Sequence, residues 1–384
     1  MKKGLFIVLN LISVIIEYLL IYLFFRFILK RVFLVSVIMT LVILLVMVFI
    51  VVFANVILRK SKIEDKNRPC EEEILKIIDK CSLVYNKKFY LHYVSAPQPN
   101  PAWCISNHIY INNQYRCSNI YLPGVVAHEL GHAISGISNY TFIPSLKMSS
   151  FISRVFYLTI VALVNVDKKV TNIIANIFFI PYYIVNLNNL IFTYHFLKED
   201  EIAANSVAAK LGYGEYLRCY YGEVLKYDDN KLFRKADLMH PSIELMINKL
   251  NFELGIKNEL LDIYYIDNIL LLANVKTKTF NIPKFITEIY PNAINGSNLV
   301  KITSDYVEKI HYNAFKGCNN IEVLSFKNVK EFPISVINNL NKLETIKIDD
   351  LNILNNIYIK YPNRLFSKKL YNSLVKNGII KEDE

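Results

Sequence analysis

The chain has 384 residues and a formal net charge of +11, a length that allows two or three folded units. Hydrophobic residues make up 53% and charged residues 20%, and the mean hydropathy is +0.27, which excludes an ordinary soluble enzyme and indicates membrane spans combined with folded domains. Lysine and arginine are spread along the chain without a basic helix, so we expect no nucleic-acid partner.

Two long apolar runs open the sequence. The first, from Gly4 to Phe25, is long enough to cross a hydrocarbon core of ~30 Å, and the second, from Val32 to Leu58, carries no charge. A signal peptide is the alternative for the first run, but its apolar stretch is too long and no small-residue cleavage site follows. We therefore predict a transmembrane hairpin in residues 1–60, in which Glu17 has to face protein or water.

Basic residues around this hairpin predict its orientation. They are more numerous at its two outer ends than in the turn between the runs: Lys2, Lys3, Arg59, Lys60, Lys62 and Lys66 against Arg26, Lys30 and Arg31. The apolar runs predict a multi-pass protein of the cell membrane. Because the more basic side stays in the cytoplasm, we expect both ends of the hairpin to be cytoplasmic. Its downstream domain then lies on the cytoplasmic side of the lipid bilayer.

Residues 61–252 are predicted to form a folded domain. Glu71–Lys80 has the apolar spacing of an amphipathic helix, and Phe89–Val94 and His108–Asn112 alternate as strands do. The backbone of the second strand could pair with an extended peptide, so we predict a peptide-binding strand at Ile109, Tyr110 and Ile111.

A second hydrophobic hairpin is predicted at about residues 151–197. Its first apolar stretch, about 151–166, is short after Arg154, and its second, 171–197, contains Pro181 and several asparagines. Each stretch could cross the membrane, lie at its surface or be a buried core helix. An even number of crossings would keep the flanking segments on one side.

The motif His128-Glu129-Leu130-Gly131-His132 carries the strongest chemical signal. We predict a helix over Leu122–Ser135, with Pro123 in its first turn and Gly136 as its stop. Two histidines four residues apart share one helix face and can bind one Zn²⁺, and the glutamate between them can serve as the general base. Two core histidines matched by chance are the alternative interpretation.

A catalytic zinc needs a third protein ligand. The acidic run Glu199-Asp200-Glu201 follows the second apolar hairpin and enters a helix of small residues, where Glu201 and Asn205 share a face. An acidic run at a helix start is also typical of a solvated cap, so the spacing leaves both interpretations open.

The order of these features resembles the HtpX and CAAX-prenyl-protease family of membrane zinc endopeptidases, over about residues 1–250. The resemblance implies an α+β zincin-like metallopeptidase domain holding one Zn²⁺ on His128, His132 and Glu201, with Glu129 and His240 as catalytic residues. It also implies that Asn205, which stands where the family has Asp, hydrogen-bonds a ligand. Met246 stands where the family has Arg.

From about residue 286 the sequence repeats. Three copies with apolar positions in register recur every 21 or 22 residues, starting near Ile286, Val307 and Val329. The tract Ala314–Ile321 resembles the BspA-like leucine-rich repeat. We therefore predict a leucine-rich-repeat solenoid in residues 262–350, followed by a tail at 351–384.

These patterns predict a membrane-embedded zinc endopeptidase that hydrolyses membrane or membrane-associated proteins, and the resemblance implies a place in protein quality control. The repeats could recruit a protein partner. The alternative is an inactive membrane-anchored scaffold that works through its repeats, an interpretation which Asn205 and Met246 favour.

Overall fold

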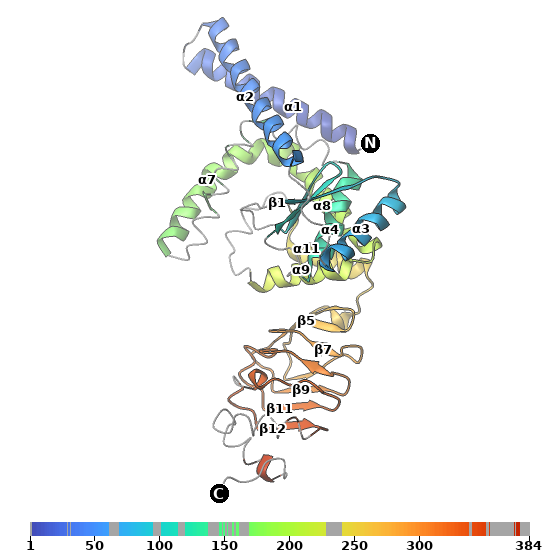
Figure 1. The fold of residues 1–384 in the computed structure, drawn as a ribbon. Coiled ribbons are helices and arrows are strands. Elements are labelled where there is room, and N and C mark those ends of the chain that lie inside the picture. Colours follow the sequence, from blue (N-terminus) through green and yellow to red (C-terminus); the bar gives the residue numbers. More distant parts are fainter. Residues whose placement is uncertain are drawn as a thin grey trace. The chain divides into compact units, whose positions relative to one another are not determined.

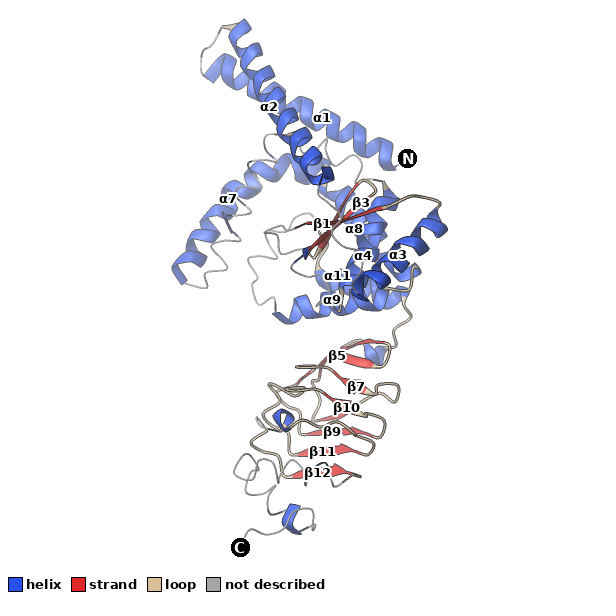
Figure 2. Ribbon diagram, viewed as in Figure 1, coloured by secondary structure: helices blue, strands red, loops and turns tan. Residues whose placement is uncertain are grey.

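A computed structural model shows a mixed α/β protein (Figure 1, Figure 2). It divides into two compact units, Met1–Leu254 and Gly255–Glu384. The described residues are 2–28, 30, 32–60, 69–94, 101–113, 120–136, 169–227, 240–337, 340–350 and a few single positions within 146–160 and 353–376. Most of the stretch at 151–166 and of the tail at 351–384 lies outside them.

The first unit begins with two long helices, α1 at Lys2–Leu23 and α2 at Phe33–Lys60, with a π-helical turn at Phe24–Ile28 between them. In the described part of the chain, one helix, Gly4–Phe27, has the length and composition needed to cross a membrane. A shorter apolar helix, Phe33–Phe49, follows it.

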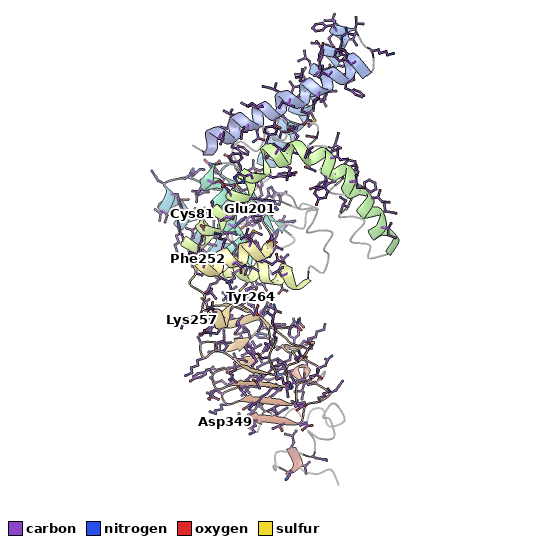
Figure 3. All side chains as sticks on the ribbon, turned by 180° about the vertical axis from the view of Figure 1, so that it is seen from behind. Cys81, Glu201, Phe252, Lys257, Tyr264 and Asp349 are labelled. Carbon is purple, nitrogen blue, oxygen red and sulfur yellow. The ribbon has the colours of Figure 1, made fainter. Side chains whose placement is uncertain are left out.

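Helix α7 spans Lys169–Phe192, which covers most of the second apolar stretch. Its exposed side carries an apolar row spaced by three or four residues: Ile173, Ile177, Ile180, Ile184, Leu187 and Ile191. Helix α1 likewise exposes Leu5, Val8, Leu11, Ile12, Ile15 and Leu19. Side chains stand out along the blue helices and the green α7 in Figure 3.

Polar residues of α1 and α7 point inward instead. Asn10, Ser13 and Glu17 of α1 are buried, and so are Asn186 and Asn189 of α7. Ser13 Oγ donates to Asn188 Oδ1 over 2.7 Å, and Glu17 accepts from the backbone N–H of Ser149 at 2.7 Å. The two helices therefore pack through a polar seam, and Glu17 faces protein.

A small sheet precedes the histidine motif. Strands β1 (Tyr90–Val94), β2 (Ala102–Ile105) and β3 (His108–Asn112) pair in the order β1-β3-β2, with β1 parallel and β2 antiparallel to β3. The prediction that β3 binds a peptide through its backbone is wrong, because β3 is paired on both sides. Ile109, Tyr110 and Ile111 are also fully buried. Among the described strands, β1 and β2 are the edges.

Five helices pack around this sheet and each other: α3 (Pro69–Tyr85), α4 (Leu122–Ser135), α8 (Tyr194–Lys210), α9 (Gly214–Tyr227) and α11 (Ile243–Glu253). Helix α3 is longer at both ends than the sequence pattern predicts. Two lysines reach the carboxyl ends of neighbouring helices: Lys80 Nζ of α3 donates to Leu211 O beyond α8, and Lys87 Nζ, just after α3, donates to Ala133 O in α4. Cations suit these positions because helix ends carry unpaired carbonyls.

The second unit consists of short strands: β4 (Ile263–Ile266), β5 (Ile269–Asn274), β6 (Thr279–Asn281), β7 (Glu288–Ile289), β8 (Ile294–Asn295), β9 (Lys301–Ser304), β10 (Lys309–Ile310), β11 (Val323–Phe326) and β12 (Thr345–Ile348). Two 3₁₀ turns, Asn258–Leu260 and Ile334–Val336, accompany them.

The strand register of this unit follows the repeat in the sequence. Phe280, Ile302, Leu324 and Ile346 pair in turn across the parallel strands β6, β9, β11 and β12, so neighbours are 22 residues apart. The apolar repeat positions, among them Ile294, Phe315 and Ile337, are buried in one continuous core. Residues at equivalent positions of the sequence repeat are therefore paired partners in these strands.

Candidate metal centre

Helix α4 begins and ends where its sequence predicts. Pro123 lies in the first turn, where a missing backbone N–H costs nothing. Gly136 adopts the left-handed conformation (φ 70°) and its N–H donates to His132 O at 3.2 Å, which closes the helix. His128 and His132 consequently lie one turn apart on the same face.

A close helix crossing brings α8 to this face. A Cβ atom on Gly131 would lie 2.5 Å from Ala204 Cα and 2.8 Å from Ala204 O, so the backbones touch without side chains between them. Gly131 interrupts a helix at a cost of roughly 1 kcal/mol relative to Ala, and this contact explains its presence. The crossing places Glu201 opposite both histidines.

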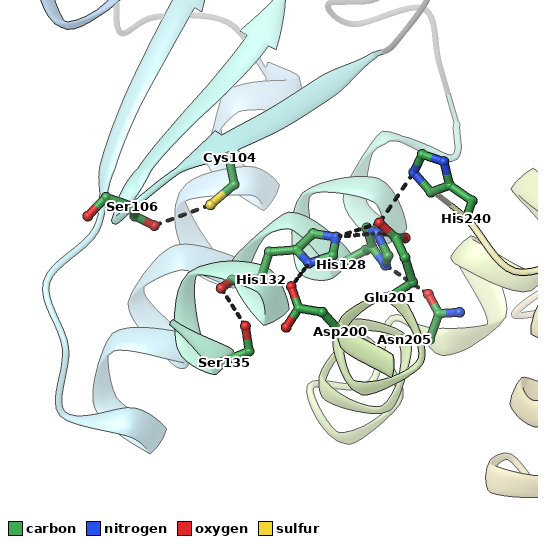
Figure 4. A network of polar contacts seen from close by, with 9 residues as sticks. All are labelled: Cys104, Ser106, His128, His132, Ser135, Asp200, Glu201, Asn205 and His240. Atoms are coloured by element: carbon green, nitrogen blue, oxygen red, sulfur yellow. Dashed lines mark hydrogen bonds and ion pairs between the residues drawn. The ribbon is translucent and has the colours of Figure 1, made fainter. Parts of the chain in front are cut away.

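Three residues bring potential ligand atoms together at the crossing (Figure 4). His128 Nε2 and His132 Nε2 are 3.1 Å apart, and the two carboxylate oxygens of Glu201 lie 3.2 Å from the former and 3.3 Å from the latter. Ligands bound 2.0–2.1 Å from a tetrahedral metal ion lie about 3.3 Å from one another. The separations among the three residues are therefore compatible with shared binding of one divalent cation.

The outer nitrogen of each imidazole has its own oxygen partner. His132 Nδ1 lies 2.8 Å from Asp200 Oδ2, and His128 Nδ1 lies 2.8 Å from Asn205 Oδ1. Because both oxygens can accept a hydrogen bond from Nδ1, each ring can turn the lone pair of its Nε2 toward a metal ion. The oxygen partners therefore favour the tautomer that metal binding requires.

Asp200 is a site residue that sequence reasoning missed. The sequence marks it only as one member of an acidic run, whereas the structure buries it against His132. The acidic run itself was the available signal. A helix turns about 100° per residue, so adjacent acids point in different directions, and the sequence does not say which imidazole each one meets.

The side-chain oxygen of Asn205 accepts two hydrogen bonds. Its Oδ1 accepts from Tyr221 Oη at 3.0 Å as well as from His128. Its Nδ2 is buried and has no hydrogen-bond partner among the described residues. An aspartate at this position could accept one hydrogen bond on each of its two oxygens and would leave no buried donor without a partner.

Two further residues border the cluster. Glu129 belongs to a group with His128 and His132 whose ligand atoms all lie within 4.8 Å of one another, a separation that a water molecule can bridge. His240 Nε2 is 3.2 Å from Glu201 Oε1, and its ring is partly exposed. Glu129 and Glu201 compete for the role of third ligand, and the short contacts to both imidazoles favour Glu201.

The charges of the cluster are mutually dependent. Burial raises the pKa of the Glu129 carboxyl, although His132 and His128 oppose this. Burial also works against the ionised form of Glu201, but His132 and His240 hold the pKa of Glu201 well below its ordinary value. Burial would lower the pKa of His132, yet Glu201 and the hydrogen bond that Asp200 accepts from the ring raise this pKa well above its usual range. The acidic groups thus hold a positive charge at the position where a cation would bind.

The structure brings together His128, Glu129, His132, Glu201, Asn205 and His240, which the sequence had singled out, and leaves Ile109, Tyr110 and Ile111 in the core of the sheet. We find no family model, curated protein or solved structure that matches this chain.

Proposed function

We propose that the protein is a membrane zinc endopeptidase similar to the HtpX and CAAX-prenyl-protease family. The convergence of two imidazole Nε2 atoms and the Glu201 carboxylate at 3.1–3.3 Å carries this proposal. Two histidines and one glutamate are a ligand set typical of catalytic zinc, which keeps a fourth position open. A glutamate next to the first histidine distinguishes a hydrolytic site from a structural one.

The residues divide the chemistry between them. A zinc ion held by His128, His132 and Glu201 would supply Lewis-acid activation of a peptide carbonyl and of water. Glu129 accepts a proton from the attacking water and delivers it to the leaving amine, and its raised pKa suits a group that both takes and gives a proton. The His240 ring, in contact with Glu201 at the border of the cluster, donates a hydrogen bond to the developing oxyanion.

We assign peptide binding to β2 rather than to β3. Strand β2 is an edge among the described strands, and it packs against α4. Figure 4 shows Cys104 of this strand on the side of the sheet next to His132. An extended peptide paired with Ala102–Ile105 would pass along the helix that carries the motif, and its backbone would supply affinity without requiring a particular sequence.

The placement in a membrane is supported by α1 and α7. Both helices bury Asn, Ser or Glu side chains and expose rows of Ile and Leu, the reverse of a soluble helix. A lipid environment removes the cost of these exposed apolar rows. We propose that both helices lie in the bilayer, and resistance of the protein to alkaline extraction from membranes tests this.

For residues 262–350 we propose a leucine-rich-repeat solenoid that binds a protein partner or recruits substrate. Its parallel strands at a 22-residue spacing and their single stacked core support the solenoid. The alternative function, an inactive scaffold, would use this unit alone.

Metal analysis combined with hydrolysis separates these functions. Purified wild-type protein and Glu129→Gln are expected to hold one zinc per chain, and Glu201→Gln to lose it. Only the wild type should cleave an unfolded protein, and a zinc chelator should stop it. Stoichiometric zinc in Glu201→Gln would refute the ligand set, whereas unchanged hydrolysis in Glu129→Gln would refute the catalytic mechanism. Zinc without hydrolysis in the wild type would favour the scaffold.

A further inference from the structure

Helix α1 contacts the beginning of α8, the helix that carries three residues of the metal centre. Two separate contacts join them, one polar and one aromatic. We propose that α1 is a positioning element of the metal centre, which orients α8 through Asn10 and Phe6, and is more than a membrane anchor. This inference rests on the proposed zinc site for its functional meaning, but the contacts themselves do not depend on a metal.

The polar contact is made by Thr193, the residue at the amino-terminal cap of α8. A threonine in this position normally uses its hydroxyl to accept a backbone N–H of its own helix. Here it makes no such bond. Its Oγ1 instead donates to Asn10 Oδ1 at 2.6 Å and accepts from Lys147 Nζ at 3.3 Å. The cap of the ligand helix is therefore connected to α1 and to the segment before α7.

All three partners of this contact are shielded from solvent. Lys147 is fully buried and also donates to Asn189 Oδ1 at 3.0 Å, and Asn10 Nδ2 donates to Phe6 O at 2.9 Å. Breaking a buried bond of this kind leaves polar atoms without partners, which is costlier than the loss of an exposed bond. The arrangement consequently favours one position of α1 against Thr193.

The aromatic contact lies one turn back along α1 and about one turn forward along α8. Phe6 is fully buried, and its ring meets that of Phe196 edge to face with centroids 5.6 Å apart. Ile7, Leu9 and Leu197 pack around this pair. Edge-to-face packing is favourable only over a narrow range of positions, so it limits rotation of α8 about its axis.

Rotation of α8 would change the positions of the site residues that this helix carries. Glu201 lies eight residues, about 12 Å, along the helix from Thr193, and Asp200 and Asn205 lie on the same helix. Its carboxylate has to stay at 3.2–3.3 Å from two imidazoles that belong to α4. Because the helix is rigid, a change in the orientation of its first turn also changes the distances between Glu201 and the two imidazoles.

Hydrogen–deuterium exchange of the full chain in lipid nanodiscs, without metal, tests the proposal. Thr193→Val removes the hydroxyl with little change in shape. The matched control is Ser13→Ala, which also removes a buried hydroxyl. Ser13 lies on α1 one turn from Asn10, but its hydrogen-bond partner, Asn188, belongs to α7 and not to α8. Thr193→Val should speed exchange of the α8 amides by about tenfold, while Ser13→Ala leaves them unchanged. Should Thr193→Val not fold, Phe6→Leu tests the second contact with the same expectation.

Zinc affinity, measured by competition with a chelator, then gives the functional result. Thr193→Val should weaken zinc binding by about tenfold, and the double variant Asn10→Ala/Thr193→Val should be no weaker than either single variant. Unchanged exchange in α8 would overturn the proposal, and so would equal effects of Thr193→Val and Ser13→Ala. A wild type that binds no zinc would refute the proposed function, while the exchange data would still decide the role of α1.

Discussion

Gly131 and Ala204 meet at the crossing of α4 and α8, where a Cβ atom on Gly131 would lie 2.5 Å from Ala204 Cα. This contact sets the separation of the two helices, and hence the distance from the imidazoles to Glu201. A single methyl group at this position would force the backbones apart.

Gly131→Ala is accordingly expected to weaken zinc binding by about tenfold or more, although alanine is the better helix former. Overpacking of this kind typically costs ~1–3 kcal/mol of stability, which a thermal unfolding curve would show. Gly4→Ala is the control, because a Cβ there meets nothing within 4 Å.

Truncating the partner should not restore the site. The atoms nearest the new methyl group are Ala204 Cα and O, which a glycine retains. Full rescue of Gly131→Ala by Ala204→Gly would therefore contradict the crossing described here.

Asp200→Asn is expected to lower zinc affinity by ~10–100-fold, because it removes the charge that supports the His132 imidazole. Isothermal titration or chelator competition measures the change. Glu199→Gln is the matched control: it removes a neighbouring carboxylate that is partly exposed and faces His195. Equal losses in the two variants would mean that general negative charge, and not the contact with His132, supports the site.

Asn205→Asp should act in two directions at once. A carboxylate behind His128 makes the ring a stronger ligand and offers one oxygen each to His128 and Tyr221, so zinc affinity should rise by about tenfold. Without metal, the added charge lies near Asp200 and Glu201 in a buried site, and the melting temperature should fall. Tyr221→Phe, which only removes a donor, should not raise the affinity.

A chain ending at Leu254 should keep the metal centre. The described residues of the cluster, His128, His132 and Glu201 among them, belong to the first unit, and the second unit has its own core. We expect full zinc stoichiometry in residues 1–254 and altered choice among protein substrates. Removing α11 as well, by ending the chain at Ser242, should destroy the fold, because Leu250 and Met246 are buried. Loss of zinc from the longer fragment would show that the units depend on each other.

The sequence predicts the local part of this site well. The helix that carries His128 and His132 has its predicted bounds, because Pro123 and Gly136 are strong signals and residues four apart share a face. The 22-residue spacing between paired strands also agrees with the period of the sequence, since a constant period favours equivalent residues in register.

Long-range contacts were harder to predict. Glu201 is far from the motif in the chain, so its position follows from the crossing at Gly131 and was expected only through the family resemblance. The prediction that β3 has a free edge was wrong for a similar reason. Alternation identifies a strand but does not reveal its neighbours. The four-residue strand β2, which the sequence pattern does not predict, pairs with the side of β3 that was expected to bind a peptide.

The register of the second unit has a consequence for how its length can change. Strands β6, β9, β11 and β12 pair with strands 22 residues away, and their buried side chains alternate with more exposed ones. An insertion of one residue within a strand would turn the inward side chains outward, whereas a gain or loss of 22 residues restores every neighbour. We therefore expect this unit to lengthen or shorten by whole repeats.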